Sequence, residues 1–290
     1  MVNMLNELSR SSLQASDCSR KVLVLPVHRR FKPIFFSHGG HLLPDSHQPL
    51  PLLTDDTLFQ GGLICRQSRD GYRFSVDAVL AAHFSVPKSG QQVLDLGCGC
   101  GVIGLILAHR FSDIAVCSLE LQEHLAELAQ ENGDQNGFAD RFRVIQGDVC
   151  AIGSLLAPES FDLVVCNPPY RKIDSGRINQ DDQAACARHE LTAVVEDFVR
   201  AAAFCVKNRG RVVFVYPAVR CNTLLSALQQ HRLTPKRLQP IYSYPGSASA
   251  RLVLVEAVKN GGEQCDILAP FYIYEHKNGD YTPAMLALYR

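Results

Sequence analysis

Hydrophobic and polar positions follow a regular order from Thr54 onward. Short apolar runs typical of buried strands alternate with stretches in which apolar side chains recur every three or four residues, as in amphipathic helices. Strands are predicted at 92–96, 115–119, 142–146, 161–166, 211–216, 237–242 and 251–257, and helices at about 75–84, 102–109, from 122, 191–202 and around 224–228. This alternation predicts an α/β fold, a mostly parallel sheet with helices on both faces.

Turn signals divide the rest of the chain. Asp70-Gly71, between apolar runs at 63–67 and 72–74, is typical of a type I′ hairpin, and Asn278-Gly279 indicates a hairpin turn in the C-terminal tail. Ser75 is expected to cap the helix that follows it. Residues 1–53 show neither the helical nor the strand spacing of apolar side chains, and they hold five of the fifteen prolines. We therefore expect a poorly ordered N-terminal extension, followed by one domain over 54–290.

Composition narrows the class of protein. The 290 residues are 47% hydrophobic and 20% charged, which is typical of globular chains. No apolar run approaches the roughly 18 to 20 residues of a membrane span, so no membrane association is expected. The eleven cysteines are scattered, without a Cys-x-x-Cys pair, and no signal peptide is apparent. We expect a reduced, cytoplasmic protein whose cysteines mostly act as buried apolar residues, and no metal site.

A glycine-rich loop, Asp95–Gly101, joins the strand at 92–96 to the next helix, and its sequence is DLGCGCG. Alternate glycines let the backbone turn tightly and let a ligand approach without a Cβ in the way. The third glycine comes one residue too early for the dinucleotide fingerprint, and the Gly-Lys-Ser/Thr ending of a phosphate loop is absent. The loop therefore favours a nucleoside-like ligand without a required pyrophosphate; a plain strand-to-helix turn is the alternative.

Acidic side chains stand at the ends of three successive predicted strands: Asp95, Glu120 and Asp148. Glu120 can accept hydrogen bonds from both hydroxyls of a ribose, and Asp148 can accept one from an adenine amino group. Taken singly, Glu120 is also compatible with a solvated acid at a helix start, and Asp148 with a turn aspartate after a glycine. Together they point to a ligand site, because the carboxyl ends of parallel strands share one edge, where open α/β sheets bind ligands.

The fourth strand ends in Asn167-Pro168-Pro169-Tyr170. Proline cannot donate to a sheet ladder, so the strand must stop there, and the residue before a proline is held extended. The Asn167 side-chain oxygen and the Pro168 carbonyl can then accept from one group, with the Tyr170 ring beside them. Two acceptors and a stacking ring suit a planar group that carries an –NH₂.

These motifs resemble class I S-adenosylmethionine-dependent methyltransferases that modify amino groups. The blocks at 71–78, 167–172, 187–190 and 250–257 are similar to bacterial tRNA adenine-N6 methyltransferases that act beside the anticodon of tRNA(Val). The resemblance, from Leu53 to the C-terminus, implies a Rossmann-like fold. Its seven-stranded sheet would have the order 3-2-1-4-5-7-6, with strand 7 antiparallel. It also implies S-adenosylmethionine as cofactor and tRNA as partner, and no obligate protein partner is inferred.

The resemblance also assigns roles to single residues. The glycines would line the methionine part of the cofactor with Asp95 on its amino group, Glu120 on the ribose, and Leu121 and Asp148 around the adenine. Asn167 and Pro168 would hold the target amine, and Tyr170 would stack on the target base. The implied cofactor-binding residues are Asp95, Gly97, Gly99, Gly101, Glu120, Leu121, Asp148, Val149 and Asn167; the implied catalytic residues are Asn167, Pro168, Pro169 and Tyr170.

Charge is distributed unevenly, although Lys+Arg and Asp+Glu both total 29. Residues 113–162 hold ten acidic and two basic residues, whereas residues 200–251 hold nine Lys or Arg and no Asp or Glu. A basic substrate half favours a polyanionic partner, although scattered surface charges are the simpler interpretation. Arg171, Lys172 and Arg177, just beyond the Asn-Pro-Pro-Tyr motif, are the nearest candidates for RNA-phosphate contacts.

The same motifs are compatible with three other functions. A methyltransferase for a protein glutamine amide, such as that of release factors, could use the same clamp, but residues 1–53 do not form the helical N-terminal domain of such enzymes. A DNA adenine methyltransferase would be expected to carry a separate target-recognition domain. A non-catalytic RNA-binding module would be expected to have a degenerate cofactor site.

Overall fold

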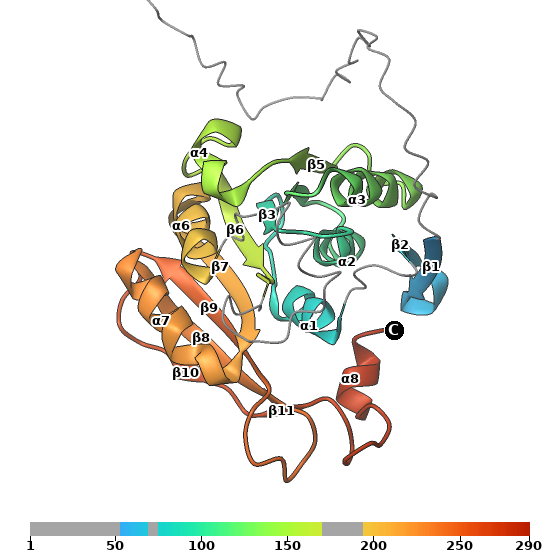
Figure 1. Ribbon diagram of the computed structural model, residues 1–290, viewed down its shortest axis with the longest axis vertical. Helices are drawn as coiled ribbons and strands as arrows, with labels where there is room; N and C mark the ends of the chain where they lie inside the picture. Colours follow the sequence, from blue (N-terminus) through green and yellow to red (C-terminus); the bar gives the residue numbers. More distant parts are fainter. Residues whose placement is uncertain (1–52, 69–74, 170–193) are drawn as a thin grey trace, which may run out of the picture. The chain divides into compact units, whose positions relative to one another are not determined.

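The computed structural model describes residues 53–68, 75–169 and 194–290 (Figure 1). The chain divides into two units, Met1–Pro33 and Ile34–Arg290, and every described residue lies in the second. The prediction for residues 1–53 therefore falls almost wholly outside the described residues.

The main sheet of the described residues has nine strands in the order β10-β8-β9-β7-β6-β3-β4-β5, with β11 also paired to β8. The strands are β3 Gln92–Leu96, β4 Ala115–Glu120, β5 Phe142–Gln146, β6 Phe161–Cys166, β7 Val206–Pro217, β8 Leu233–Tyr242, β9 Leu252–Lys259, β10 Asp266–Ile267 and β11 Phe271–Tyr272. Only β9 runs antiparallel to its neighbours in this sheet.

The seven longer strands confirm the predicted order and the reversed strand. The strand count differs from the prediction, because β10 and β11 add two-residue strands beside β8. Segments this short carry no alternation that a pattern search could detect. β7 also begins five residues before its predicted start at Arg211, where Val206 pairs with Phe161 across a register shift.

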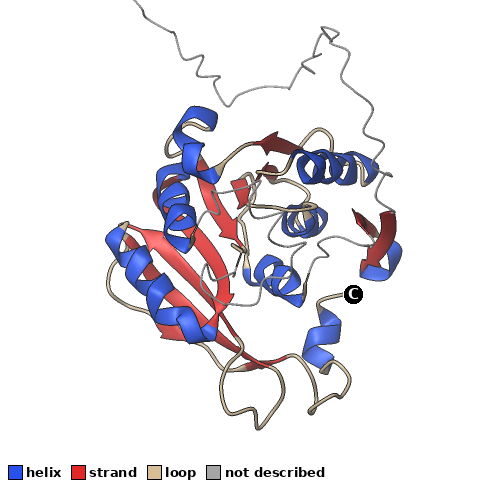
Figure 2. Ribbon diagram, viewed as in Figure 1, coloured by secondary structure: helices blue, strands red, loops and turns tan. Residues whose placement is uncertain are grey.

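Helices cover both faces of the sheet (Figure 2). One face carries α1 Val76–Phe84, α2 Val102–Arg110 and α3 Glu123–Gln135, and the other carries α4 Ile152–Leu155, α6 Val195–Cys205 and α7 Cys221–Gln230. Alternate residues of β6 divide between the two cores: Leu163 packs with the first set and Val164 with the second. A short C-terminal helix, α8 Pro283–Ala287, buries Met285. No helix in the described part of the chain has the length and apolarity to cross a membrane.

Of the local predictions, the Asp70-Gly71 hairpin lies outside the described residues, and the Ser75 cap needs correction. β2 Leu63–Ser68 pairs with β1 Leu53–Leu58, a strand whose polar sequence was not predicted. Ser75 stands at the N-cap position of α1 in an extended conformation, but its side chain makes no capping hydrogen bond. The second turn is confirmed, because Asn278 has φ 59° and Tyr274 bridges Tyr281 in antiparallel fashion.

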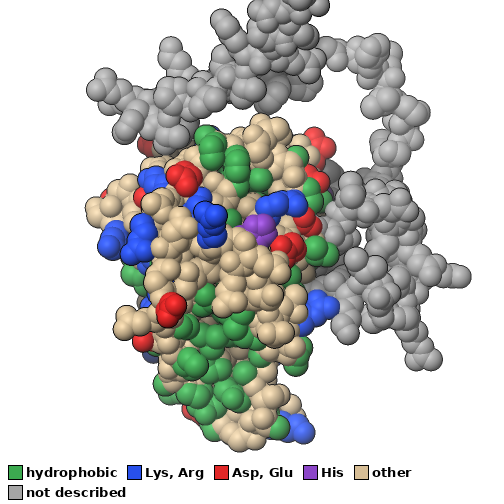
Figure 3. All heavy atoms as spheres, turned by 90° about the vertical axis from the view of Figure 1, so that its left-hand side faces the viewer, with side chains coloured by type: hydrophobic (Ala, Val, Ile, Leu, Met, Phe, Trp, Pro, Cys, Tyr) green, Lys and Arg blue, Asp and Glu red, His purple; other side chains and the backbone are tan. Residues whose placement is uncertain are grey.

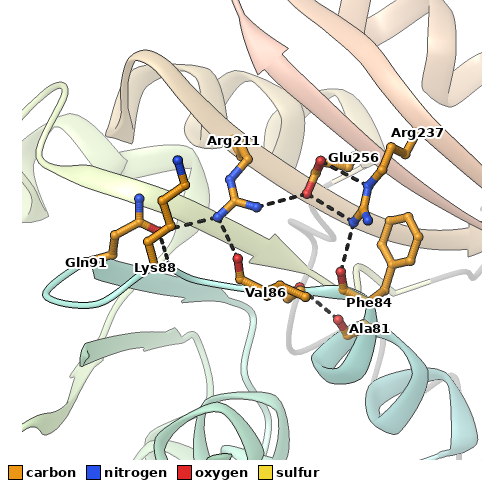
Figure 4. Close-up of polar contacts among 9 residues, drawn as sticks. Ala81, Phe84, Val86, Lys88, Gln91, Arg211, Arg237 and Glu256 are labelled. Carbon is orange, nitrogen blue, oxygen red and sulfur yellow. Dashed lines mark hydrogen bonds and ion pairs between the residues drawn. The ribbon is translucent and has the colours of Figure 1, made fainter. Parts of the chain in front are cut away.

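A polar cluster joins α1 to β7, β8 and β9 (Figure 4). Glu256 of β9, only 6% exposed, accepts hydrogen bonds from Arg211 at 3.3 Å and from Arg237 at 3.2 and 3.3 Å. Arg211 also donates to the Val86 carbonyl at 2.8 Å, and Arg237 donates to the Phe84 carbonyl at 3.1 Å. The two arginines therefore satisfy one buried carboxylate and tie the end of α1 to the sheet.

Candidate active site

The predicted site residues that are described lie along the carboxyl edge of the sheet. Leu96 pairs with Leu119 of β4 and with Cys166 of β6, and Glu120 pairs with Gln146 of β5. The residues that follow these positions are the glycine loop, Leu121, Asp148 and Asn167, so the register brings them to the same edge. This confirms that the four strand ends lie together.

The glycine loop needs glycine for its own backbone. Gly97, Gly99 and Gly101 have φ of 72°, 57° and 87°, the left-handed region that side chains disfavour. A Cβ on Gly97 would also lie 2.9 Å from the ring of Phe198. The Leu119 carbonyl accepts from the Gly97 and Cys98 amides at 2.8 and 3.0 Å, which holds the loop over the end of β4.

Glu120 connects the glycine loop to the next helix. Its side chain is 6% exposed, and its two oxygens accept from the Gly99 amide at 2.9 Å and the Gln122 amide at 3.0 Å. No ion pair with a cation of the described residues involves Glu120. Each oxygen keeps a second lone pair, so the carboxylate can still accept from the hydroxyls of a ligand.

Asp95 is fully buried beneath this loop. One carboxylate oxygen accepts from the Gly104 amide at 3.1 Å, and the other has no hydrogen-bond partner in the described structure. Burial, and secondarily the charge of Glu120, raise the pKa of Asp95 to about 7, although the Gly104 amide lowers it. A buried carboxylate oxygen without a partner is costly, and a nearby cation would relieve that cost.

The two residues implied to contact the adenine of the cofactor, Leu121 and Asp148, are both partly exposed. Leu121 leaves 45% of its surface exposed directly after β4. Asp148 is half-buried and caps the turn at 149–151, where one of its oxygens accepts from the Cys150 amide at 2.8 Å. Val149 is buried beside it. An exposed leucine and a partly exposed carboxylate suit a planar base that carries an amino group.

The structure places the first part of the Asn-Pro-Pro-Tyr motif. Asn167 is half-buried, Pro168 is buried and Pro169 is exposed, immediately after the last residue of β6. Tyr170 lies outside the described residues, as do Arg171, Lys172 and Arg177. The stacking role and the RNA-phosphate contacts therefore stay predictions.

The uniform basic half predicted for 200–251 needs revision. Arg200 pairs with Asp197 at 2.8 Å, and Lys207 pairs with Asp162 at 2.7 Å. Arg211 and Arg237 share Glu256. These partners lie outside the 200–251 segment. Arg200 and Asp197 are neighbours on one helix, whereas the carboxylates that neutralise the other three cations are brought close only by the tertiary structure.

Sequence reasoning missed the residue that supports the glycine loop from α3. Asn132 is fully buried; it accepts from the Arg66 amide at 2.9 Å and donates to the carbonyls of Arg66 at 2.9 Å and Cys100 at 3.0 Å. It thus joins β2, α3 and the glycine loop. A lone asparagine within a helix pattern gives no sequence signal, because its partners come from distant segments.

The fold and the arrangement of these strand ends define a Rossmann-like methyltransferase. Residues 75–234 match the family model described as methyltransferase small domain, and the chain belongs to this family. The crystal structure of a predicted O-methyltransferase, protein Atu636 from Agrobacterium tumefaciens, is similar in fold, with a TM-score of 0.60 and 24% identity over 73% of this chain and 94% of that one.

Among curated relatives, the chain is similar to proteins named tRNA1(Val) (adenine(37)-N6)-methyltransferase. The protein of that name from Porphyromonas gingivalis strain W83 is 33% identical over 196 residues, which cover 67% of this chain and 75% of the relative. The one from Shewanella loihica is 28% identical over 226 residues, covering 76% of this chain and 92% of the relative.

Proposed function

We propose that the protein transfers a methyl group from S-adenosylmethionine to the exocyclic N6 of an adenine in tRNA, in the anticodon loop. The observation that carries the proposal is Asn167-Pro168-Pro169 at the end of β6, next to the glycine loop on the same sheet edge. The names of the similar proteins support the same substrate.

The residues at the edge fit the cofactor by their chemistry. Asp95 has a buried oxygen without a partner, which favours an ammonium or sulfonium nearby. Glu120 retains lone pairs for ribose hydroxyls, while Leu121 and Asp148 offer an apolar surface and an acceptor to adenine. When bound, the cofactor supplies an activated methyl group on a sulfonium.

The chain's own residues then act mainly on the target amine. The N6 lone pair is delocalised into the adenine ring, so the nitrogen is a weak nucleophile. Acceptance of its hydrogens by the Asn167 side chain and the Pro168 carbonyl would make it more amine-like and fix its direction of attack. No strong general base is required, because the proton becomes acidic once the nitrogen is alkylated. A single-stranded loop offers the base at the lowest unstacking cost.

Substitution of Asn167 tests the proposal. Asn167→Ala removes one acceptor at the reacting centre, and we expect methyl transfer to fall about a hundredfold or more. Asn208→Ala, at an exposed asparagine near the start of β7, is the control and should keep wild-type activity. Tritiated methyl transfer to unmodified bulk tRNA, followed by nucleoside digestion, measures the product.

Label in N6-methyladenosine that disappears with Asn167→Ala supports the assignment. Label in a protein glutamine, or full activity of Asn167→Ala, contradicts it.

A further inference from the structure

Strands β7, β8 and β9 project beyond the point where β6 ends. Cys166, the last residue of β6, pairs with Phe214 of β7, but β7 continues to Pro217. Three more strand residues correspond to ~10 Å. Leu252, the first residue of β9, pairs with both Pro217 of β7 and Ile241 of β8. The ends of β7 and β8 and the start of β9 therefore lie side by side, beyond the end of β6. The three strands therefore form a wall on the side of Asn167 away from the glycine loop.

Two connections form the top of this wall, residues 218–220 after β7 and residues 243–251 between β8 and β9; we call them the rim. The Ala218 amide donates to the Arg251 carbonyl at 3.0 Å, and the Arg251 amide donates to the Ile241 carbonyl at 2.7 Å. Within the second connection, the Tyr244 amide donates to the Ser247 hydroxyl at 3.1 Å. The rim is thus held in place by backbone hydrogen bonds.

The rim exposes aromatic, apolar and cationic groups. Val219 has 87% of its surface exposed, Tyr244 is half-buried and Arg251 is exposed. Just below, the rings of Tyr242 and Tyr272 lie 5.8 Å apart. In the side view, apolar side chains gather on the lower part of the face, where Figure 1 places the ends of β8 and β11 (Figure 3). Such exposed apolar area beside a reactive edge is typical of a binding surface.

Charge separates the rim from the opposite side of the site. Both rim connections contain arginine, and residues 200–251 contain no Asp or Glu. Of the rim arginines, Arg251 is exposed, so its guanidinium is accessible to a polyanion. Across the glycine loop, α3 presents exposed Glu123, Glu127 and Glu131. A polyanion at this edge would be repelled from α3 and attracted to the rim.

We infer that the rim binds the single-stranded nucleotides next to the target adenine, with Tyr244 stacking on a base and Arg251 contacting a phosphate. Aromatic faces combined with cations are the features that bind single-stranded RNA. This inference rests on the proposed function, since the adenine at Asn167 sets which nucleotides reach the rim.

Fluorescence anisotropy of a labelled, unmodified anticodon stem-loop of tRNA(Val) with the full chain tests the inference. Tyr244→Ala should raise the Kd by roughly 5- to 100-fold, whereas Tyr244→Phe, which keeps the ring, should stay close to wild type. Arg251→Ala should lower the slope of log K against log salt by about 0.7. Lys88→Ala removes an exposed cation before β3, far from the rim, and should change neither value.

An unchanged Kd in Tyr244→Ala together with an unchanged salt slope in Arg251→Ala would overturn the inference. If Tyr244→Ala does not fold, judged by its thermal transition, the salt slope of Arg251→Ala decides alone. Methyl transfer is scored separately: a wild type that binds the stem-loop through the rim but methylates no adenine would contradict the proposed function and leave the rim assignment standing.

Discussion

Two glutamates in the same sheet, Glu256 beneath the end of α1 and Glu120 at the carboxyl edge, are equally buried at 6% exposure but have different partners. Glu256 is neutralised by Arg211 and Arg237 (Figure 4). Within the described part of the chain, Glu120 accepts hydrogen bonds from the backbone amides of Gly99 and Gln122 and forms no ion pair. Asp95, close to Glu120, has one oxygen with no hydrogen-bond partner among the described residues.

The difference separates a structural carboxylate from carboxylates suited to a ligand. A buried charge must be compensated, and Glu256 is compensated by side chains of its own fold. At the carboxyl edge, Glu120 lies close enough to Asp95 for its charge to raise the pKa of Asp95. Neither carboxylate forms an ion pair with a cation of the described residues. We expect the first region to govern stability and the second to govern ligand binding.

The largest effect is expected from Glu256→Ala. It leaves Arg211 and Arg237 without their carboxylate, and the free energy of unfolding should fall by about 3 kcal/mol, the low end for a broken buried pair, because both arginines keep some solvent contact. Urea unfolding measures the change. Asp55→Ala breaks the exposed pair with Arg66 and should cost under ~1 kcal/mol. Equal losses of unfolding free energy in the two variants would contradict the expected difference between a buried and an exposed ion pair.

The next effect concerns pH and Asp95. Its raised pKa means that the folded chain holds this proton more tightly than the unfolded chain, so its contribution to stability falls as pH rises from about 4 toward 7. Binding of a cationic cofactor favours the ionised form. Cofactor affinity should therefore drop about tenfold per pH unit below 7 and level off above it.

Calorimetry of S-adenosylmethionine binding between pH 5.5 and 8 checks this pH dependence. Asp95→Asn should bind more weakly at pH 8 and lose most of the pH dependence, while Glu159→Gln, an exposed acid on the loop before β6, should follow the wild-type curve. A wild-type affinity that is independent of pH would remove Asp95 from the cofactor's surroundings.

The smallest effect is expected from Glu120→Gln. The amide keeps one acceptor but cannot accept from the Gly99 and Gln122 amides with both atoms, so cofactor binding should weaken by about 1–2 kcal/mol. The same calorimetry measures it, and urea unfolding should show a smaller loss than Glu256→Ala. A large loss of stability with unchanged affinity would assign Glu120 to the structure instead of the ligand.

Much of the fold was predictable because its signals are local. β3 and β6 begin and end where the apolar runs do, since strands buried on both faces need apolar side chains at nearly every position. β1 was missed because its Thr-Asp-Asp-Thr core is polar and lies in a two-stranded sheet, where pairing with β2 and not burial decides its conformation.

The candidate site divides in the same way. The sequence by itself determined the glycine loop, the acids at the strand ends and the Asn-Pro-Pro stop, because each depends on backbone rules that act over a few residues. Only the tertiary structure decided that Asn132 supports the loop and that Glu256 neutralises Arg211 and Arg237. Hydrogen bonds and ion pairs join whichever groups the fold brings within about 3 Å, and that proximity leaves no periodic trace along the chain.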